Sequence, residues 1–253
     1  MVTAAIVLHS FDYLESSRIL KLMTREAGVR SVLARGARKS KKRFGAALDL
    51  YAEGNAELQT KPGRDLDTLS SFDVLRARPQ LAEHLGRFTG ASMIAELTLR
   101  FARDAADPEL YDTVAATLDA LATASPDDAR DVAIAGAWRV LAELGIAPTL
   151  DACAECHASI DASASAVFSH PAGGVLCARC GHLARSGRTL PPDARDAMRD
   201  WLSGLEHSLA DVNAARAHQR LLREFLREHL ADDRPLRAFD VWERDLFSAG
   251  GAA

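Results

Sequence analysis

The chain has 253 residues and a formal net charge of −4, because 31 lysines and arginines face 35 aspartates and glutamates. That length suits one large or two modest globular domains, and an apolar content of 48% argues against intrinsic disorder. No apolar run approaches the roughly 20 residues that cross a bilayer, and no leader pattern precedes the first alternating segment, so we expect a cytoplasmic protein. The charge is uneven: residues 1–77 carry 13 basic and 9 acidic side chains, whereas residues 78–253 carry 18 and 26.

The first 77 residues have the pattern of a small β-barrel. Apolar residues alternate over short segments separated by turn residues, and the five predicted strands span residues 3–11, 17–23, 29–33, 48–60 and 67–75. Five strands in so short a stretch suit an OB-fold, a barrel whose strands and loops bind oligonucleotides in many proteins. We therefore predict an OB-fold nucleic-acid-binding domain over residues 1–77.

A run of cations follows the third predicted strand. Six of the nine residues from 35 to 43 are basic, and no carboxylate occurs between residues 27 and 48. Such density is typical of phosphate binding, because each neutralised phosphate releases counterions. The alternative is an ordinary solvated loop. We favour DNA contacts by this run, with Phe44 behind it buried at the barrel's edge. The residues expected to make these contacts are Arg35, Arg38, Lys39, Lys41, Lys42 and Arg43.

From residue 79 onward the apolar period changes from 2 to 3.6, which predicts helices. We expect them over residues 81–104, 108–122, 126–144, 191–209, 213–230 and 236–247. Trp138 and Leu141 share one face of the third helix and are expected to be core residues. The 47 alanines of the chain suit closely packed helices. The predicted fold is therefore α+β, with the five-stranded OB-fold barrel followed by an all-helical domain over residues 78–253.

The four cysteines form two C-x-x-C pairs on either side of a predicted hairpin turn at residues 169–174. Two such pairs about 20 residues apart supply four thiolates, the number that tetrahedral Zn²⁺ takes in structural sites. We therefore expect one structural zinc ion per chain in a hairpin at residues 151–183. Its expected ligands are Cys153, Cys156, Cys177 and Cys180.

Other interpretations of the cysteines are weaker. Disulfides suit secreted proteins, since cytosolic thiols stay reduced, and four sulfurs leave no open position on a catalytic zinc. His157, His170 or His182 is close enough in sequence to replace a cysteine, although a neighbouring surface histidine is the commoner case. Phosphate-binding loops, dinucleotide fingerprints and common hydrolase motifs are absent from the sequence. We therefore predict a protein that is not an enzyme.

A second group of cations lies on the helix predicted over residues 213–230. Arg216, Arg220, Arg223 and Arg227 are spaced by four, three and four residues, so they share one helix face. They form either a solvated face paired with Glu224 or a surface that binds an anion or a partner. Both interpretations stay open.

The order of these parts resembles the bacterial recombination mediator family RecO. The more specific features are the run from Ala34 to Lys39 with Arg43 and Phe44, and the segment from Leu141 through Gly145, Pro148 and Leu150 to Cys153. The stretch from Ser169 to Cys180 is also similar to that family's zinc hairpin. The resemblance covers roughly residues 2–246.

This resemblance implies an N-terminal OB domain, a helical domain with a zinc site, and no enzymatic activity. Proteins of the family bind single- and double-stranded DNA and anneal complementary strands. With the partner RecR, they help RecA replace single-strand binding protein (SSB) on gapped DNA. The resemblance assigns the six cations of residues 35–43 to DNA and the four cysteines to metal. It also implies an apolar pocket, with cations at its edge, that binds the acidic tail of SSB. Arg139 is a candidate for one of these cations. The alternative role of Arg139 is an ion pair with Glu143.

The chain departs from the family pattern at two places. The sequence Leu236-Arg237-Ala238-Phe239 stands where the family often has a serine and a second cation, and His157 stands where a glycine commonly follows the second cysteine. A tight backbone turn is expected at His157.

Two functions of different classes follow. The first is a DNA-binding and strand-annealing mediator, located in the cytoplasm at the nucleoid. The second is a redox switch or chaperone in which the cysteines act and the basic run is only solvated. A zinc-assisted nuclease ranks last.

Overall fold

The computed structural model describes residues 1–37, 44, 48–60, 63, 65–184, 186–230 and 234–248, with side chains up to residue 244. The chain forms two compact units, and each is described by itself. The first combines residues 1–129 with the C-terminal segment from residue 236, and the second is the intervening stretch, residues 130–235. Within the described ranges, no helix combines the length and the apolar character that crossing a membrane requires.

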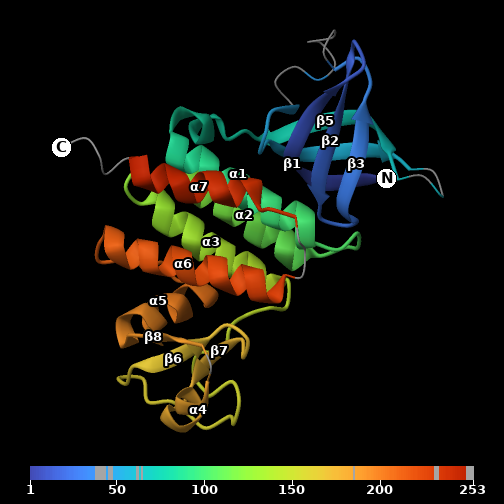
Figure 1. Ribbon diagram of the computed structural model, residues 1–253. Coiled ribbons are helices and arrows are strands. Elements are labelled where there is room, and N and C mark those ends of the chain that lie inside the picture. The colour runs from blue at the N-terminus through green and yellow to red at the C-terminus, as the bar shows by residue number, and fades with distance from the viewer. Residues whose placement is uncertain are drawn as a thin grey trace. The chain divides into compact units, whose positions relative to one another are not determined.

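A closed five-stranded barrel occupies the N-terminal part of the first unit (Figure 1). The strands pair in the order β1-β2-β3-β5-β4, and β4 pairs with β1 to close the ring. All neighbours are antiparallel except β3 and β5. The OB-fold prediction is therefore confirmed. The strands are β1 (Val2–Tyr13), β2 (Ser17–Thr24), β3 (Gly28–Ala34), β4 (Glu53–Gln59) and β5 (Asp67–Arg76).

Alternating side chains fill the barrel. Leu20 and Leu22 of β2, Val32 of β3 and Leu58 of β4 are buried together, as the period of 2 requires. Phe44 is also buried in this core, as the sequence indicated, and Ala37 packs against it. The two residues that flank positions 38–43 therefore lie at the barrel core.

A β-bulge in β1 changes which side chains face outward. The pairing register with β2 shifts between Val7 and His9, so that Leu8 is the extra residue. Before the shift Ala5 and Val7 point into the core, whereas after it Phe11 and Tyr13 are exposed. A bulge adds one residue to one strand and so re-aims the side chains that follow.

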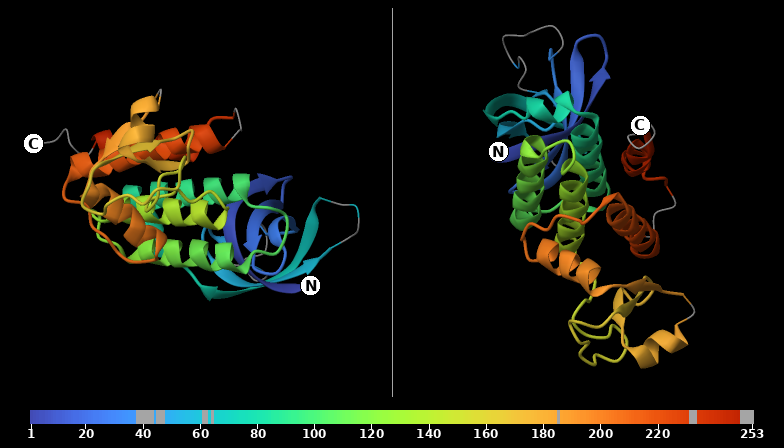
Figure 2. Two further views of the ribbon diagram at one scale, coloured as in Figure 1. Left: turned by 90° about the horizontal axis from the view of Figure 1, so that it is seen from below. Right: turned by 90° about the vertical axis from the view of Figure 1, so that its left-hand side faces the viewer.

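The helices η2, α1, α2 and α7 belong to the described part of the first unit. The 3-10 helix η2 (Pro79–Glu83) precedes α1 (Leu85–Phe101), and α2 (Pro108–Thr123) begins at Asp107, whose carboxylate accepts a hydrogen bond from the Leu110 N–H. The C-terminal helix α7 (Arg237–Ser248) packs beside α1, and the views of Figures 1 and 2 agree on this. The Glu96 carboxylate of α1 accepts hydrogen bonds from the Ala238 and Phe239 N–H groups, which satisfies the first turn of α7.

A buried arginine connects the barrel with α2. The Arg78 guanidinium donates to Glu53 of β4 and to Asp119 of α2 at 2.7 Å each, and to the Tyr51 carbonyl at 2.7 Å. Arg76 reaches the same two carboxylates from the surface. The Arg78 side chain is 1% exposed and that of Arg76 is 54% exposed.

The second unit has a helical core formed by α3 (Ala129–Glu143), α5 (Pro192–Leu202) and α6 (Val212–His229). Trp138 of α3 packs edge-on against Phe225 of α6 with ring centroids 5.1 Å apart, as expected for core residues. The predicted helix at 191–209 ends seven residues early, because Gly204 takes a φ of +81° that stops the helix. Asp211 caps α6: its carboxylate accepts hydrogen bonds from the N–H groups of Asn213 and Ala214 in the first turn.

A small antiparallel sheet lies at one end of the second unit (Figures 1 and 2). The predicted hairpin is formed by β6 (Ala166–Ser169) and β7 (Gly174–Leu176), and β8 (Arg188–Leu190) pairs with the other edge of β6. The short helix α4 (Ala178–Leu183) follows β7. The sequence did not indicate β8 or α4, which have too few residues to show a period. Gly174 is required here, since a Cβ on it would lie 2.3 Å from the Thr149 carbonyl oxygen.

Candidate metal centre and nucleic-acid interface

Two separate backbone turns bring the four cysteines together. The first pair sits in a tight turn that is closed by a hydrogen bond from the His157 N–H to the Cys153 carbonyl. His157 has a φ of +59°, the left-handed conformation that a glycine adopts most easily, so the expected tight turn is present. Cys177 follows β7 and precedes α4, and Cys180 lies in the first turn of that helix.

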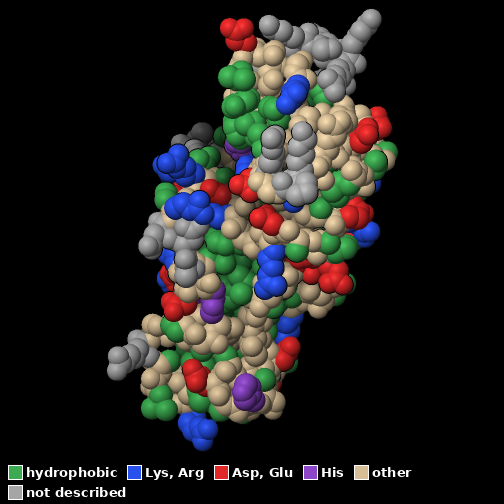
Figure 3. Space-filling model, turned by 90° about the vertical axis from the view of Figure 1, so that its right-hand side faces the viewer, with side chains coloured by type: hydrophobic (Ala, Val, Ile, Leu, Met, Phe, Trp, Pro, Cys, Tyr) green, Lys and Arg blue, Asp and Glu red, His purple; other side chains and the backbone are tan. Residues whose placement is uncertain are grey.

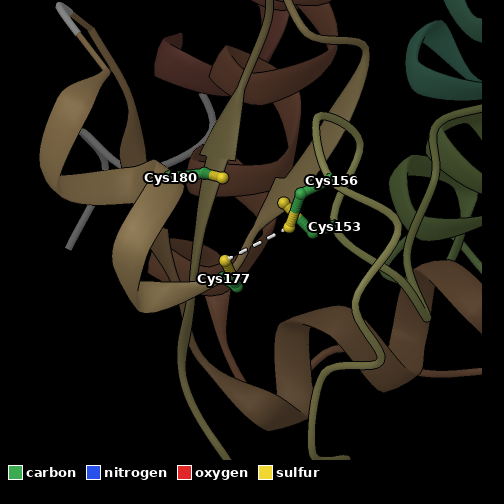
Figure 4. A group of neighbouring side chains, drawn as sticks. All are labelled: Cys153, Cys156, Cys177 and Cys180. Carbon is green, nitrogen blue, oxygen red and sulfur yellow. Dashed lines mark hydrogen bonds between the residues drawn. The ribbon is translucent and has the colours of Figure 1, made fainter.

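The sulfurs have the spacing of a tetrahedral metal site. All four lie within 4.8 Å of one another (Figure 4). The Cys156 and Cys177 sulfurs are 3.7 Å apart, far longer than the roughly 2.05 Å of a disulfide bond. Four sulfurs placed about 2.3 Å from a central zinc lie about 3.8 Å from each other. The donor set and its spacing therefore fit a metal ion, and all four cysteines are free thiols in the structure.

The environment of the thiols favours a bound cation. Burial opposes ionisation of Cys153, but hydrogen bonds from the backbone N–H groups of Cys177, Cys156 and Glu155 lower the pKa of this thiol to about 6. A backbone hydrogen bond from Cys180 likewise lowers the pKa of Cys177. In contrast, a hydrogen bond with the Cys156 sulfur raises the pKa of Cys180. Crowded sulfurs thus do not ionise together by themselves, whereas a coordinating dication deprotonates all of its thiol ligands.

One neighbouring residue was missed by the sequence reasoning. The exposed Arg179 lies beside the sulfurs of Cys156 and Cys180, and its interaction with them raises the pKa of its guanidinium. Four thiolates with one Zn²⁺ carry a net charge of −2, so a guanidinium beside them offsets part of that charge. The signal was available, because Arg179 stands inside the second C-x-x-C pair.

The nearby histidines are not part of this cluster. Among the described residues, the group whose ligand atoms converge contains the four cysteines alone. His157 and His182 are exposed, and the imidazole of His170 is 2.9 Å from the Glu224 carboxylate. Glu224 also accepts from Arg188 of β8, whereas one of the two interpretations that the sequence left open paired it with arginines of its own helix.

Of the six predicted DNA-binding cations, the structure describes Arg35. Arg35 is exposed in the turn directly after β3. The other five, Arg38, Lys39, Lys41, Lys42 and Arg43, fall outside the described residues. The strand pairing still places the start of this run: Ala34 of β3 pairs with Arg18 of β2, and Tyr13 at the end of β1 pairs with Ser17. The run therefore begins at the end of the barrel where β1 ends.

Arg139 and the arginines of α6 stay predictions. Arg139 is half-buried on α3, with its guanidinium beside Gly204. The second unit also holds a largely apolar pocket of about 310 Å³ between β8, the start of α5 and α6, and Arg139 is not among the described residues that line it. On α6, Arg220 and Arg227 are exposed and Arg216 and Arg223 are half-buried.

Comparisons with known proteins cover both parts of the chain. The family model described as "Recombination protein O N terminal" matches residues 1–78, and the one described as "Recombination protein O C terminal" matches residues 82–238. A DNA repair protein RecO from Anaeromyxobacter dehalogenans (strain 2CP-C) is 37% identical over 242 residues, which cover 92% of this chain and 93% of that protein. The DNA repair protein RecO of Gloeobacter violaceus is 32% identical over 240 residues, which cover 90% of this chain and 87% of that protein.

Proposed function

Because this chain belongs to the recombination protein O (RecO) family of DNA repair proteins, we propose that it is a non-enzymatic recombination mediator that binds single- and double-stranded DNA. The observation that carries the proposal is an OB-fold barrel whose third strand leads directly into six cations within nine residues. Contact with several phosphates by such a segment releases counterions and favours binding. Residues 1–77 are the proposed DNA-binding domain, and residues 78–253 are the proposed helical domain.

The same charge distribution supports strand annealing. Annealing brings two polyanions together, and cations that neutralise phosphates lower the repulsion between them. We propose that the protein anneals complementary strands and, together with RecR, promotes loading of RecA on SSB-coated DNA. It would act in the cytoplasm at the nucleoid. The acidic tail of SSB is proposed to bind the helical domain, with Arg139 as a candidate contact.

The metal has a structural role in this proposal. We assign one Zn²⁺ per chain to Cys153, Cys156, Cys177 and Cys180, where it would hold the turn at residues 153–157 against the start of α4. The surrounding sheet has only short strands, and so small an element seldom stays folded by its apolar core alone.

The DNA-binding proposal is tested by the salt dependence of single-stranded DNA binding. A variant with Arg38, Lys39, Lys41 and Lys42 changed to Ala loses up to four phosphate contacts. Its slope of log affinity against log salt is therefore expected to flatten by up to about 2.8, at about 0.7 per contact. The fold-decrease in affinity between about 50 and 200 mM salt is therefore expected to be up to roughly 50 times smaller for this variant than for the unmodified chain.

The matched control for this test replaces the two exposed arginines of α6, Arg220 and Arg227, with Ala. Its slope is expected to equal that of the unmodified chain; a flatter slope would place DNA on α6 as well. An unchanged slope in the fourfold variant would refute the assignment of the basic segment.

The close thiols favour one alternative, a redox switch. Four free sulfurs within 4.8 Å of one another are also the starting point for disulfide formation once a metal leaves. Strand annealing measured before and after peroxide treatment separates the two functions. A mediator with a structural site loses annealing only when the hairpin unfolds, whereas a switch changes activity as zinc is released with the remainder of the chain folded.

A further inference from the structure

Three aromatic side chains lie in a row on the outer face of the barrel. His9, Phe11 and Tyr13 are alternate residues of β1, and all three follow the bulge, so they point to the same side of the strand. His9 is exposed, and Phe11 and Tyr13 are 43% and 40% exposed. The rings of His9 and Phe11 are 5.9 Å apart between centroids. Figure 3 shows hydrophobic side chains gathered at the end of the barrel that lies at the top of the view.

This row is not explained by packing of the barrel. The core is filled by the opposite faces of the same strands, and the row lies outside it. Elsewhere aromatic rings are mostly buried: Trp138, Trp201 and Trp242 are each at most 1% exposed. Two large rings left on one strand of a small barrel form an apolar surface of the kind that marks a binding site.

Cations lie beside the row, although the carboxylates of Asp12 and Asp49 line the same pocket as Phe11. The register places Lys21 of β2 opposite His9, and the Lys21 ammonium donates to Ser31 of β3 on the same face. Asp12, the carboxylate between Phe11 and Tyr13, faces Arg18 at 3.4 Å. Arg35 follows the strand that pairs with β2, at the end where Tyr13 lies.

The described residues on either side of the cationic run lie against the barrel. At its start, Ala37 packs against the barrel core. Past its end, Leu48 and Leu50 line a pocket of about 320 Å³ together with Phe11 and Arg18. The described residues on both sides of the run therefore lie at the barrel, and Leu48 and Leu50, which follow it, lie beside Phe11.

We propose that His9, Phe11 and Tyr13 form a stacking surface for the bases of single-stranded DNA, while Lys21 and Arg35 beside them bind its phosphates. The proposal rests on the DNA-binding function given above and adds to it a preference for unpaired bases. Aromatic rings beside a cationic groove bind single strands of any sequence, because every base has a π face. In a duplex those faces are stacked on each other, so the rings gain nothing there.

The test compares single-stranded and duplex DNA. The variant Phe11→Leu with Tyr13→Leu keeps apolar side chains at both positions but removes the rings. Stacking accounts for about fivefold to 150-fold in affinity per base, so the double variant is expected to bind labelled oligothymidine at least about 25-fold more weakly. Its duplex affinity and its salt slope are expected to match those of the unmodified chain, because no phosphate contact is lost.

The matched control is Phe88→Leu, which removes a ring of similar exposure, 37%, from α1. It is expected to leave both affinities unchanged. A tryptophan reporter adds a direct measurement: because the native tryptophans are buried and out of contact with DNA, oligothymidine is expected to quench the fluorescence of Tyr13→Trp more than that of the unmodified chain.

The outcomes separate the two proposals. If the unmodified chain binds oligothymidine with a steep salt slope but the double variant binds it equally well, the stacking surface is refuted and the DNA-binding function stands. If the double variant loses duplex and single-stranded affinity alike, the rings do not act by stacking. If the unmodified chain binds neither DNA, both proposals fail.

Discussion

Arg76 and Arg78 allow a direct measurement of what burial does to an ion pair. Both arginines reach the carboxylates of Glu53 and Asp119, but the Arg78 side chain is 1% exposed and that of Arg76 is 54% exposed. Replacing Arg78 with Met removes three hydrogen bonds of 2.7 Å and leaves Glu53, which is only 17% exposed, without its buried partner. Loss of one partner from a buried pair costs about 3–5 kcal/mol. Arg76→Met breaks a solvated pair and is expected to cost less than about 1 kcal/mol.

Hydrogen exchange is the suitable assay for this pair of variants, because it reports on β4 and α2 separately from the second unit. Under conditions where exchange follows the opening equilibrium, Arg78→Met is expected to speed exchange of peptides from these two elements by at least roughly 150-fold. For Arg76→Met the expected acceleration is no more than about fivefold. Equal effects of the two substitutions would show that desolvation does not govern this network and would refute the reasoning.

Two further predictions concern the second unit. Cys177→Ser is expected to abolish binding of one zinc per chain, as measured by elemental analysis. It is also expected to speed hydrogen exchange at residues 151–183 while hydrogen exchange in the barrel stays unchanged. Retained zinc would contradict the four-sulfur site. Burial lowers the pKa of His218 to about 4 from its ordinary 6.5. Between pH 6.5 and pH 4 the imidazole is therefore neutral in the folded chain but protonated in the unfolded chain. The unfolding free energy of this unit is therefore expected to fall by up to roughly 3 kcal/mol as the pH is lowered from 6.5 to 4. Urea unfolding at several pH values measures this dependence. His218→Gln should flatten it, whereas replacement of the exposed His182 should not.

The sequence predicted the barrel because local alternation and barrel geometry agree except at two places, the bulge in β1 and the start of the fourth strand. The fourth strand starts at Glu53 instead of residue 48, because Tyr51 takes a φ of +67° and holds the chain in a turn before the strand. The pairing of α7 with α1 was not predictable, since two amphipathic helices far apart in the sequence do not indicate their partners.

The candidate metal site was predictable from spacing, whereas the aromatic row was not. The C-x-x-C pairs bring their ligands together with little help from the rest of the fold. In β1, by contrast, continuous alternation from residue 3 places Phe11 and Tyr13 on the same side as Ala5 and Val7, which face the core. The extra residue at Leu8 reverses this phase, and nothing in the local sequence marks the bulge.

The packing of α7 beside α1 also bears on the order in which the chain acquires its structure during synthesis. The second unit is one continuous stretch, and its four cysteines emerge from the ribosome within 28 residues of each other, so we expect it to fold once residue 235 has left the ribosome. Synthesis of the first unit begins earlier, but its folding is completed later. The face of α1 that packs against α7 stays uncovered until residues 130–235 and then α7 have been synthesised. A nascent chain halted before residue 237 would therefore expose α1 and be a target for chaperones.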